Sequence, residues 1–147
     1  MNAVARDLPA VAAASPHAEW DDARFLAALE SCTLPPWVFT HRNHVRAAYL
    51  YLTRLPFGAA IDAMCATLRR YTAHLGAADK YHETITVAFV ALVNAQRAQP
   101  QESWEEFVLR NPALLDAKLL GAYYGRETLG SDRARRVFLL EPRTPAA

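Results

Sequence analysis

The sequence predicts an all-α fold, a single compact bundle of five to seven helices. Residues that cap helices and prolines that end them recur along the chain. No segment alternates apolar and polar residues between turn dipeptides, as half-buried strands do. The chain has 147 residues, of which 52% are apolar, so it has the size and composition of one domain with a sizeable core.

The first helix is expected near residues 18–32. Ser15 followed by Pro16 is typical of an N-cap with proline at the first helical position, and the paired prolines of "TLPPW" end the helical stretch. The predicted organisation is a flexible tail over residues 1–17, the helical domain over 18–142 and a flexible end over 143–147.

Two helices are predicted after these prolines. Thr40 can cap a helix over 41–54, which Pro56 ends. A longer helix over roughly 57–75 is expected to stop at Gly76, because glycine readily takes the left-handed conformation of a helix C-terminus.

The second half of the chain is predicted to be helical too. Asp79 can cap a helix over roughly 80–97, and Ser103 with Glu106 matches the capping box of a short fifth helix. Two further helices are expected, one over 111–124 and a short one from Ser131.

Two of these helices have informative side-chain patterns. At 100° per residue, the apolar face of helix 41–54 also contains both of its histidines, and the opposite face contains Arg42, Asn43, Arg46, Thr53 and Arg54. The stretch from Ile85 to Val93 is apolar all round apart from Thr86, which predicts a central helix covered on every side.

The strongest candidate site combines these two helices. His41 and His44 are three residues apart, so their Cβ atoms are about 5–6 Å from each other, close enough for both imidazoles to reach one ion. His82 and Glu83 stand at the head of the other helix, and helical bundles build metal sites from such residues on facing helices.

The metal could be zinc, copper or iron. Ligation by His41, His44 and His82 would suit zinc or copper, whereas Glu83 in place of one histidine gives the donor set of non-haem iron(II). In a metal-dependent enzyme for a small molecule, Glu83 would be the fourth ligand or the general base that takes a proton from metal-bound water. The neighbouring residues expected to bind or position substrate are Tyr81, Thr84 and Thr86.

Two other interpretations stay open. The same residues could form a buried hydrogen-bond network in a non-catalytic helical binding module, or His82 and Glu83 could act as an acid–base pair without metal. The basic run "GSDRARR" is either a solvated helix face or a phosphate-contacting patch, and the acids around it favour the solvated face.

Charge and cysteine content limit the class of partner. The 16 basic and 15 acidic residues give a net charge of +1, which argues against nucleic acid or an anionic membrane as a partner. No apolar run approaches the eighteen or so residues of a membrane span. Cys32 and Cys65 lack CxxC spacing, so neither a disulfide framework nor a thiolate zinc site is indicated. This cysteine usage fits the reducing cytosol, and a cytoplasmic protein is expected. A homodimer is compatible with the sequence, which leaves the oligomeric state open.

Four motifs, "FTHRNHVRAAYLYL", "YHETIT", "WEEFVLRNPALLD" and the closing "S-x-x-ARR-x-F", occur in this order between Trp37 and Pro142. In this respect the chain resembles a family of small bacterial all-helical proteins with FTHxxH and YHET motifs. The resemblance implies no particular activity. It suggests that polar as well as apolar positions define the group, which favours a function for the histidines and Glu83.

Overall fold

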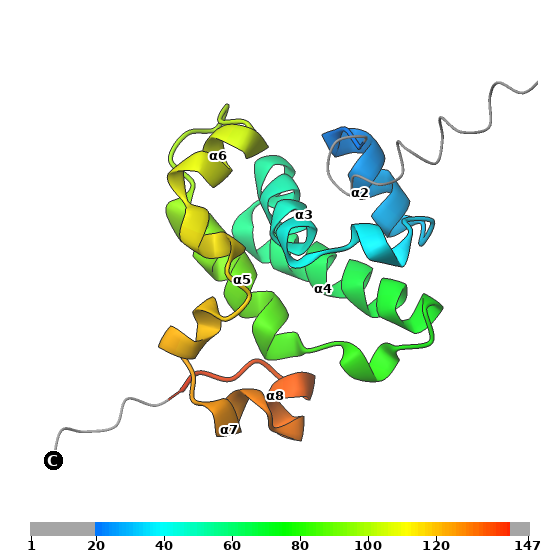
Figure 1. The fold of residues 1–147 in the computed structure, drawn as a ribbon, viewed down its shortest axis with the longest axis vertical. Helices are drawn as coiled ribbons and strands as arrows, with labels where there is room; N and C mark the ends of the chain where they lie inside the picture. The colour runs from blue at the N-terminus through cyan, green and yellow to red at the C-terminus, as the bar shows by residue number, and fades with distance from the viewer. Residues whose placement is uncertain (1–19, 142–147) are drawn as a thin grey trace, which may run out of the picture.

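The structure is a computed structural model that describes residues 20–141. This part of the chain contains seven α-helices and no strand, so the predicted all-α bundle is confirmed (Figure 1). The α-helices are α2 (Asp22–Glu30), α3 (His41–Arg54), α4 (Phe57–His74), α5 (Glu83–Gln96), α6 (Trp104–Arg110), α7 (Arg126–Leu129) and α8 (Asp132–Arg136). Four short 3-10 helices join them: η1 (Pro36–Val38), η2 (Ala78–Lys80), η3 (Pro112–Leu115) and η4 (Leu119–Ala122).

Helix α5 is the central element, as its apolar sequence predicts. It packs directly against α3, α4 and α8. Val90 and Val93 are fully buried, and Phe89 is 2% exposed. Figure 1 shows α7 and α8 near the beginning of α5 and α6 near its other end. None of the helices in the described part of the chain combines the length and apolar character that a membrane crossing requires.

Helix α3 has the predicted bounds, and the Thr40 side chain accepts the Asn43 N–H as its cap. Asn43 and Arg46, on the face opposite the histidines, are buried because α2 and η1 cover that side of the helix. The Asn43 side chain donates to the Val38 carbonyl at 2.7 Å. The Arg46 guanidinium is buried and pairs with Asp22 at 2.7 Å.

The first residues of two helices differ from the prediction. Helix α2 begins after Asp21, whose carboxylate accepts the Arg24 N–H, and the predicted start at Ser15 lies outside the described residues, as do the predicted tails. Helix α5 begins at Glu83 rather than near residue 80, because the His82 ring, not Asp79, caps it. Asp79 belongs to η2 instead.

The continuous helix predicted over 111–124 is wrong. The segment forms η3 and η4 with a break at Asp116, whose backbone is extended. The Asp116 carboxylate accepts the Lys118 N–H at 2.9 Å. Because this local hydrogen bond satisfies a backbone donor outside the helical pattern, aspartate stabilises a turn here. The turn brings residues 117–121 beside the start of α5.

The ends of the other helices follow the sequence. Gly76, with φ +72°, lies just beyond α4, and Ser131 caps α8. The short helix α7 is an addition to the predicted set.

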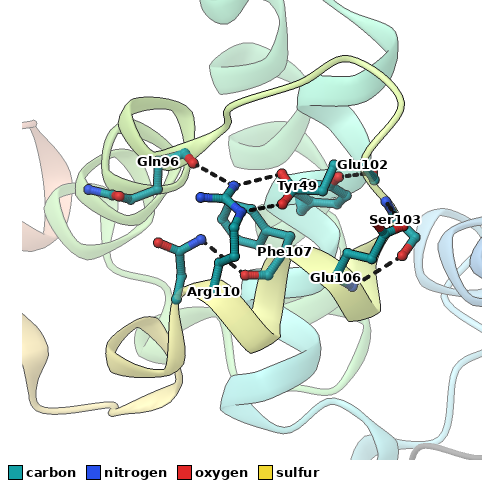
Figure 2. Close-up of polar contacts among 8 residues, drawn as sticks. Tyr49, Gln96, Glu102, Ser103, Glu106, Phe107 and Arg110 are labelled. Atoms are coloured by element: carbon teal, nitrogen blue, oxygen red, sulfur yellow. Dashed lines mark hydrogen bonds and ion pairs between the residues drawn. The ribbon is translucent and has the colours of Figure 1, made fainter.

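Helix α6 and the loop before it are tied together by polar contacts (Figure 2). The capping box of Ser103 and Glu106 is present, as predicted. Arg110 donates to both carboxylate oxygens of Glu102 and, at 3.1 Å, to the Gln96 carbonyl. These bonds join the two ends of the loop over 97–103.

Candidate functional site

His41 and His44 lie side by side at the start of α3, as predicted. Their ring centroids are 6.3 Å apart, and both rings contact Phe89 of α5. His41 Nε2 lies 3.0 Å from the Leu114 carbonyl. Because a carbonyl can only accept, Nε2 of His41 bears the proton and donates it. A protonated nitrogen cannot be a metal ligand, so the bond to η3 occupies the position at which His41 Nε2 would bind an ion.

His44 has an unsatisfied ring nitrogen. The residue as a whole is partly exposed, but its Nε2 is buried and has no hydrogen-bond partner among the described residues. The ring stacks on Phe39 with a centroid distance of 5.8 Å. Burial, and then the positive charge that His41 can take up, lower the pKa of His44 to about 4. His44 is therefore neutral at physiological pH.

His82 has both ring nitrogens engaged by the backbone. Nδ1 accepts the Ile85 N–H at 3.1 Å, which makes His82 the N-cap of α5. Nε2 donates to the Leu129 carbonyl of α7 at 2.7 Å. With Nδ1 accepting and Nε2 donating, both ring nitrogens of His82 have backbone partners, and neither is left for a metal ion.

The predicted meeting of His82 with His41 and His44 does not occur. Helices α3 and α5 do pack together, but the two α3 histidines face Phe89. Phe89 follows His82 by seven residues, which is about 10 Å along a helix axis. In the described part of the chain, no group of three or more His, Cys, Asp or Glu side chains is arranged to hold a metal ion.

Glu83 belongs to a separate polar cluster between α5 and α4. Its Oε1 accepts from the Tyr81 hydroxyl at 2.6 Å and from Arg69 of α4 at 2.7 Å. The Arg69 guanidinium also lies over the Tyr81 ring, 5.1 Å from its centroid. No described hydrogen bond joins Glu83 to His82, so the acid–base pair considered from the sequence is not formed.

Burial keeps the hydroxyl of Tyr81 and the thiol of the neighbouring Cys65 neutral. It raises the pKa of Tyr81, and hydrogen bonding with Cys65 and Glu83 adds to the increase. Burial also raises the pKa of the Cys65 thiol. The phenol is therefore a hydrogen-bond donor to the Glu83 carboxylate, and the thiol is not a reactive thiolate at neutral pH.

The two threonines predicted to position substrate bond to the backbone instead. Thr84 is fully buried; its hydroxyl donates to the Val137 carbonyl at 2.8 Å and accepts the Leu139 N–H at 3.1 Å. Thr86 donates to the His82 carbonyl at 2.8 Å. Thr84 thus attaches the segment after α8 to the start of α5.

Two open grooves flank residues 81–83. The first, groove A, has a volume of about 720 Å³ and lies between the start of α5, the segment from Ala117 to Arg126, and α8. His82 lies at its wall, and its cationic residues are Lys118, Arg126 and Arg135. No described acidic residue lines groove A.

The second, groove B, has a volume of about 510 Å³ and lies between the end of α4, η2 and α8. Tyr81 lines it together with Arg69 and Arg135. The remaining charged residues that line groove B are Asp79, Asp132 and Arg136. Arg135 is the residue common to both grooves, so α8 separates them.

The grooves leave no clear pattern in the sequence, because their walls come from distant segments. The basic run "GSDRARR" is a sequence signal for a surface that binds anions, but its acidic neighbours favour a solvated helix face. Lys118 and Arg126 have no distinctive spacing, and only the break at Asp116 and the short helix α7 bring them to the same groove.

No protein-family model matches the chain, and no significant match to a curated protein or to a solved structure was found.

Proposed function

We propose that the protein is a non-catalytic helical module that binds a small anionic molecule in groove A. The observation that supports this most is the cluster of Lys118, Arg126 and Arg135 around one concave surface without a lining carboxylate. The side chains of Lys118 and Arg126 make no hydrogen bond or ion pair with another described residue. Cations that a fold leaves unpaired in a groove are suited to an anionic ligand.

The shape and the remaining lining of groove A suit a compact organic anion. A volume of about 720 Å³ is within the range of small-molecule sites. Ile85, Leu120 and Leu129 supply apolar contacts beside the cations. A ligand with one anionic group and an apolar body would therefore use both kinds of surface.

The walls of groove A are held by hydrogen bonds. The bond from His82 to the Leu129 carbonyl attaches α7 to the start of α5. Gly125 donates its N–H to Glu141 Oε1 at 2.6 Å, and a Cβ at position 125 would lie 2.9 Å from that oxygen. The histidine then has the structural role that the sequence offered as the alternative to metal ligation.

The metal-dependent enzyme remains the second candidate. One observation favours it: Nε2 of His44 is buried without a described partner, beside a second imidazole. Against it, backbone groups engage both ring nitrogens of His82, and the described residues include no group of three His, Cys, Asp or Glu side chains arranged to hold an ion. The binding module therefore explains more of the polar contacts.

A fluorescence titration with two matched probes tests the proposal. 8-Anilinonaphthalene-1-sulfonate has an anionic group on an apolar body, and N-phenyl-1-naphthylamine is the same body without the sulfonate. The sulfonate is expected to bind more tightly than the neutral probe, and its affinity is expected to fall as salt screens the cations. The double substitution Lys118→Gln and Arg126→Gln should weaken sulfonate binding about tenfold, because each partly exposed charge contributes up to about 1 kcal/mol.

Arg133→Gln is the matched control, because Arg133 is an exposed arginine of α8 that lines neither groove. It removes one charge and should leave the affinity for the sulfonate within about twofold of the wild type. Equal affinity for the two probes, or an equal loss in the double variant and in the Arg133 control, would refute a specific anion site in groove A.

A further inference from the structure

Groove B differs from groove A in the signs of its charges. The charged residues that line groove A are all cationic, whereas groove B has the carboxylates of Asp79 and Asp132 among its arginines. Its apolar surface includes Tyr81 and Ala78. Its volume of about 510 Å³ is sufficient for a small organic molecule.

The opposite charges of groove B are close together but do not pair. Asp132 and Arg136 are four residues apart on α8, so their Cβ atoms are about 5–6 Å from each other. Nevertheless, neither side chain makes a hydrogen bond or an ion pair with a described residue. The Asp79 carboxylate has no such partner either, because only its backbone carbonyl accepts a bond, from Arg135 at 3.1 Å.

The third arginine of groove B has a different role. Arg69 pairs with Glu83 at 2.7 Å and lies over the Tyr81 ring. This pairing neutralises Arg69 and fixes one wall. The groups left for a ligand are therefore two carboxylates and two guanidinium groups, those of Arg135 and Arg136.

We propose that groove B binds a small zwitterion of the amino-acid class. The ligand's ammonium group lies at the carboxylates of Asp79 and Asp132, and its carboxylate is held by Arg135 and Arg136. An apolar side chain of the ligand contacts the face of groove B that contains Tyr81. This site is additional to the anion site of groove A, with which it shares Arg135.

A ligand of a single charge fits groove B less well. A simple anion held by the arginines would also lie near the carboxylates of Asp79 and Asp132, and these like charges would repel it. A simple cation would meet the guanidinium groups in the same way. Only a molecule with both charges gains at both ends, which makes the two-sign lining a basis for specificity.

Three forms of one amino acid test the charge requirement. The wild-type protein is titrated with L-phenylalanine, with N-acetyl-L-phenylalanine, which lacks the ammonium charge, and with L-phenylalaninamide, which lacks the carboxylate. Amide chemical shifts are followed by NMR. We expect saturable shifts with L-phenylalanine in residues 78–81 and 132–136, and at least fivefold weaker binding of both derivatives.

Substitutions then locate the two ends of the ligand. Asp132→Asn and Arg136→Gln should each weaken binding of L-phenylalanine at least threefold, while Arg133→Gln should leave it unchanged. Amide spectra establish that each variant is folded. Binding of N-acetyl-L-phenylalanine as tight as that of L-phenylalanine would overturn the proposal, as would the absence of saturable shifts with L-phenylalanine.

The two grooves can be tested separately. Arg126→Gln should weaken only the sulfonate probe of groove A, and Asp132→Asn only L-phenylalanine. Arg135→Gln should weaken both, because Arg135 lines both grooves. If the wild-type protein binds only one of the two probes, the proposal for the other groove has failed.

Discussion

Acid should destabilise this protein through His44 well before its carboxylates are protonated. The buried imidazole is neutral in the folded state because burial, and then His41, lower its pKa to about 4. In the unfolded chain the same group has its ordinary pKa of 6.5. Between these values the unfolded state binds a proton that the folded state does not, so the free energy of unfolding decreases as the pH falls.

The size of the effect follows from the two pKa values. At pH 7 both states are largely unprotonated at His44, and the contribution is close to zero. At pH 5 the unfolded imidazole is protonated and the folded one is still mostly neutral, which costs about 2 kcal/mol. The full difference of about 3 kcal/mol is reached below pH 4. A loss of 2 kcal/mol is a substantial fraction of the 5–15 kcal/mol that is usual for a domain.

Urea denaturation at pH 7, 6 and 5 measures this loss directly. The wild type is compared with His44→Leu, which is expected to remove the decrease over this interval. The imidazole proton shifts of His44, followed by NMR, give its pKa in the folded state. A wild-type stability that does not change between pH 7 and 5, an unchanged slope in His44→Leu, or a His44 ring that titrates near 6.5 would refute the reasoning.

Two carboxylates contribute in a different pH range. Hydrogen bonds from Arg110 lower the pKa of Glu102, and those from Thr128 and Gly125 lower the pKa of Glu141. Stabilisation by a carboxylate with a lowered pKa is present above its ordinary pKa of 4.5 and is lost as the pH falls below that value. These two carboxylates therefore do not account for a decrease between pH 7 and 5, and the comparison with His44→Leu isolates the share of that decrease that belongs to His44.

Three further predictions concern stability and metal binding. Thr84→Val should lower the free energy of unfolding by about 2 kcal/mol, because it leaves the part-buried Val137 carbonyl and the Leu139 N–H unpaired, and hydrogen exchange at Leu139 should accelerate. Arg110→Gln should increase hydrogen exchange in the loop over 97–103 with little change in global stability, since the Arg110 side chain is 44% exposed and pairs of this kind contribute little. Protein purified without a histidine tag should show no thermal shift with zinc, iron or copper; a stoichiometric metal that is lost in His44→Leu would favour the enzyme instead.

The fold could be predicted because local chemistry determines its elements. Thr40, Ser103 and Gly76 occupy the positions that their preferences in helix ends indicate. The errors arose where side chains form less common local bonds. The imidazole of His82 caps α5, and the carboxylate of Asp116 interrupts a segment that has helical periodicity. Neither interaction leaves a repeating pattern in the sequence.

The candidate site could be predicted only in its parts. Helical spacing correctly places His41 beside His44, and the central position of α5 follows from its composition. The offset of α3 relative to α5 along the helix axes cannot be predicted in this way, because periodicity gives the face of a helix that is buried and not its axial position. A displacement of about 10 Å is sufficient to give His82 different partners. The grooves depend on still more distant contacts between α5 and residues after 117.

The polar residues at the head of the apolar helix α5 can now be interpreted as attachments. Each one bonds a different neighbour: His82 bonds α7, Glu83 bonds α4, and Thr84 bonds the segment that follows α8. Helix α7 supplies part of the wall of groove A, and α4 supplies part of the wall of groove B. Because adjacent helical residues diverge by about 100°, one short motif can hold elements on opposite sides of a helix. The motif "YHET" would then serve binding by fixing the geometry of both grooves, while the charges proposed to contact ligands come from Lys118, Arg126, Asp79 and α8.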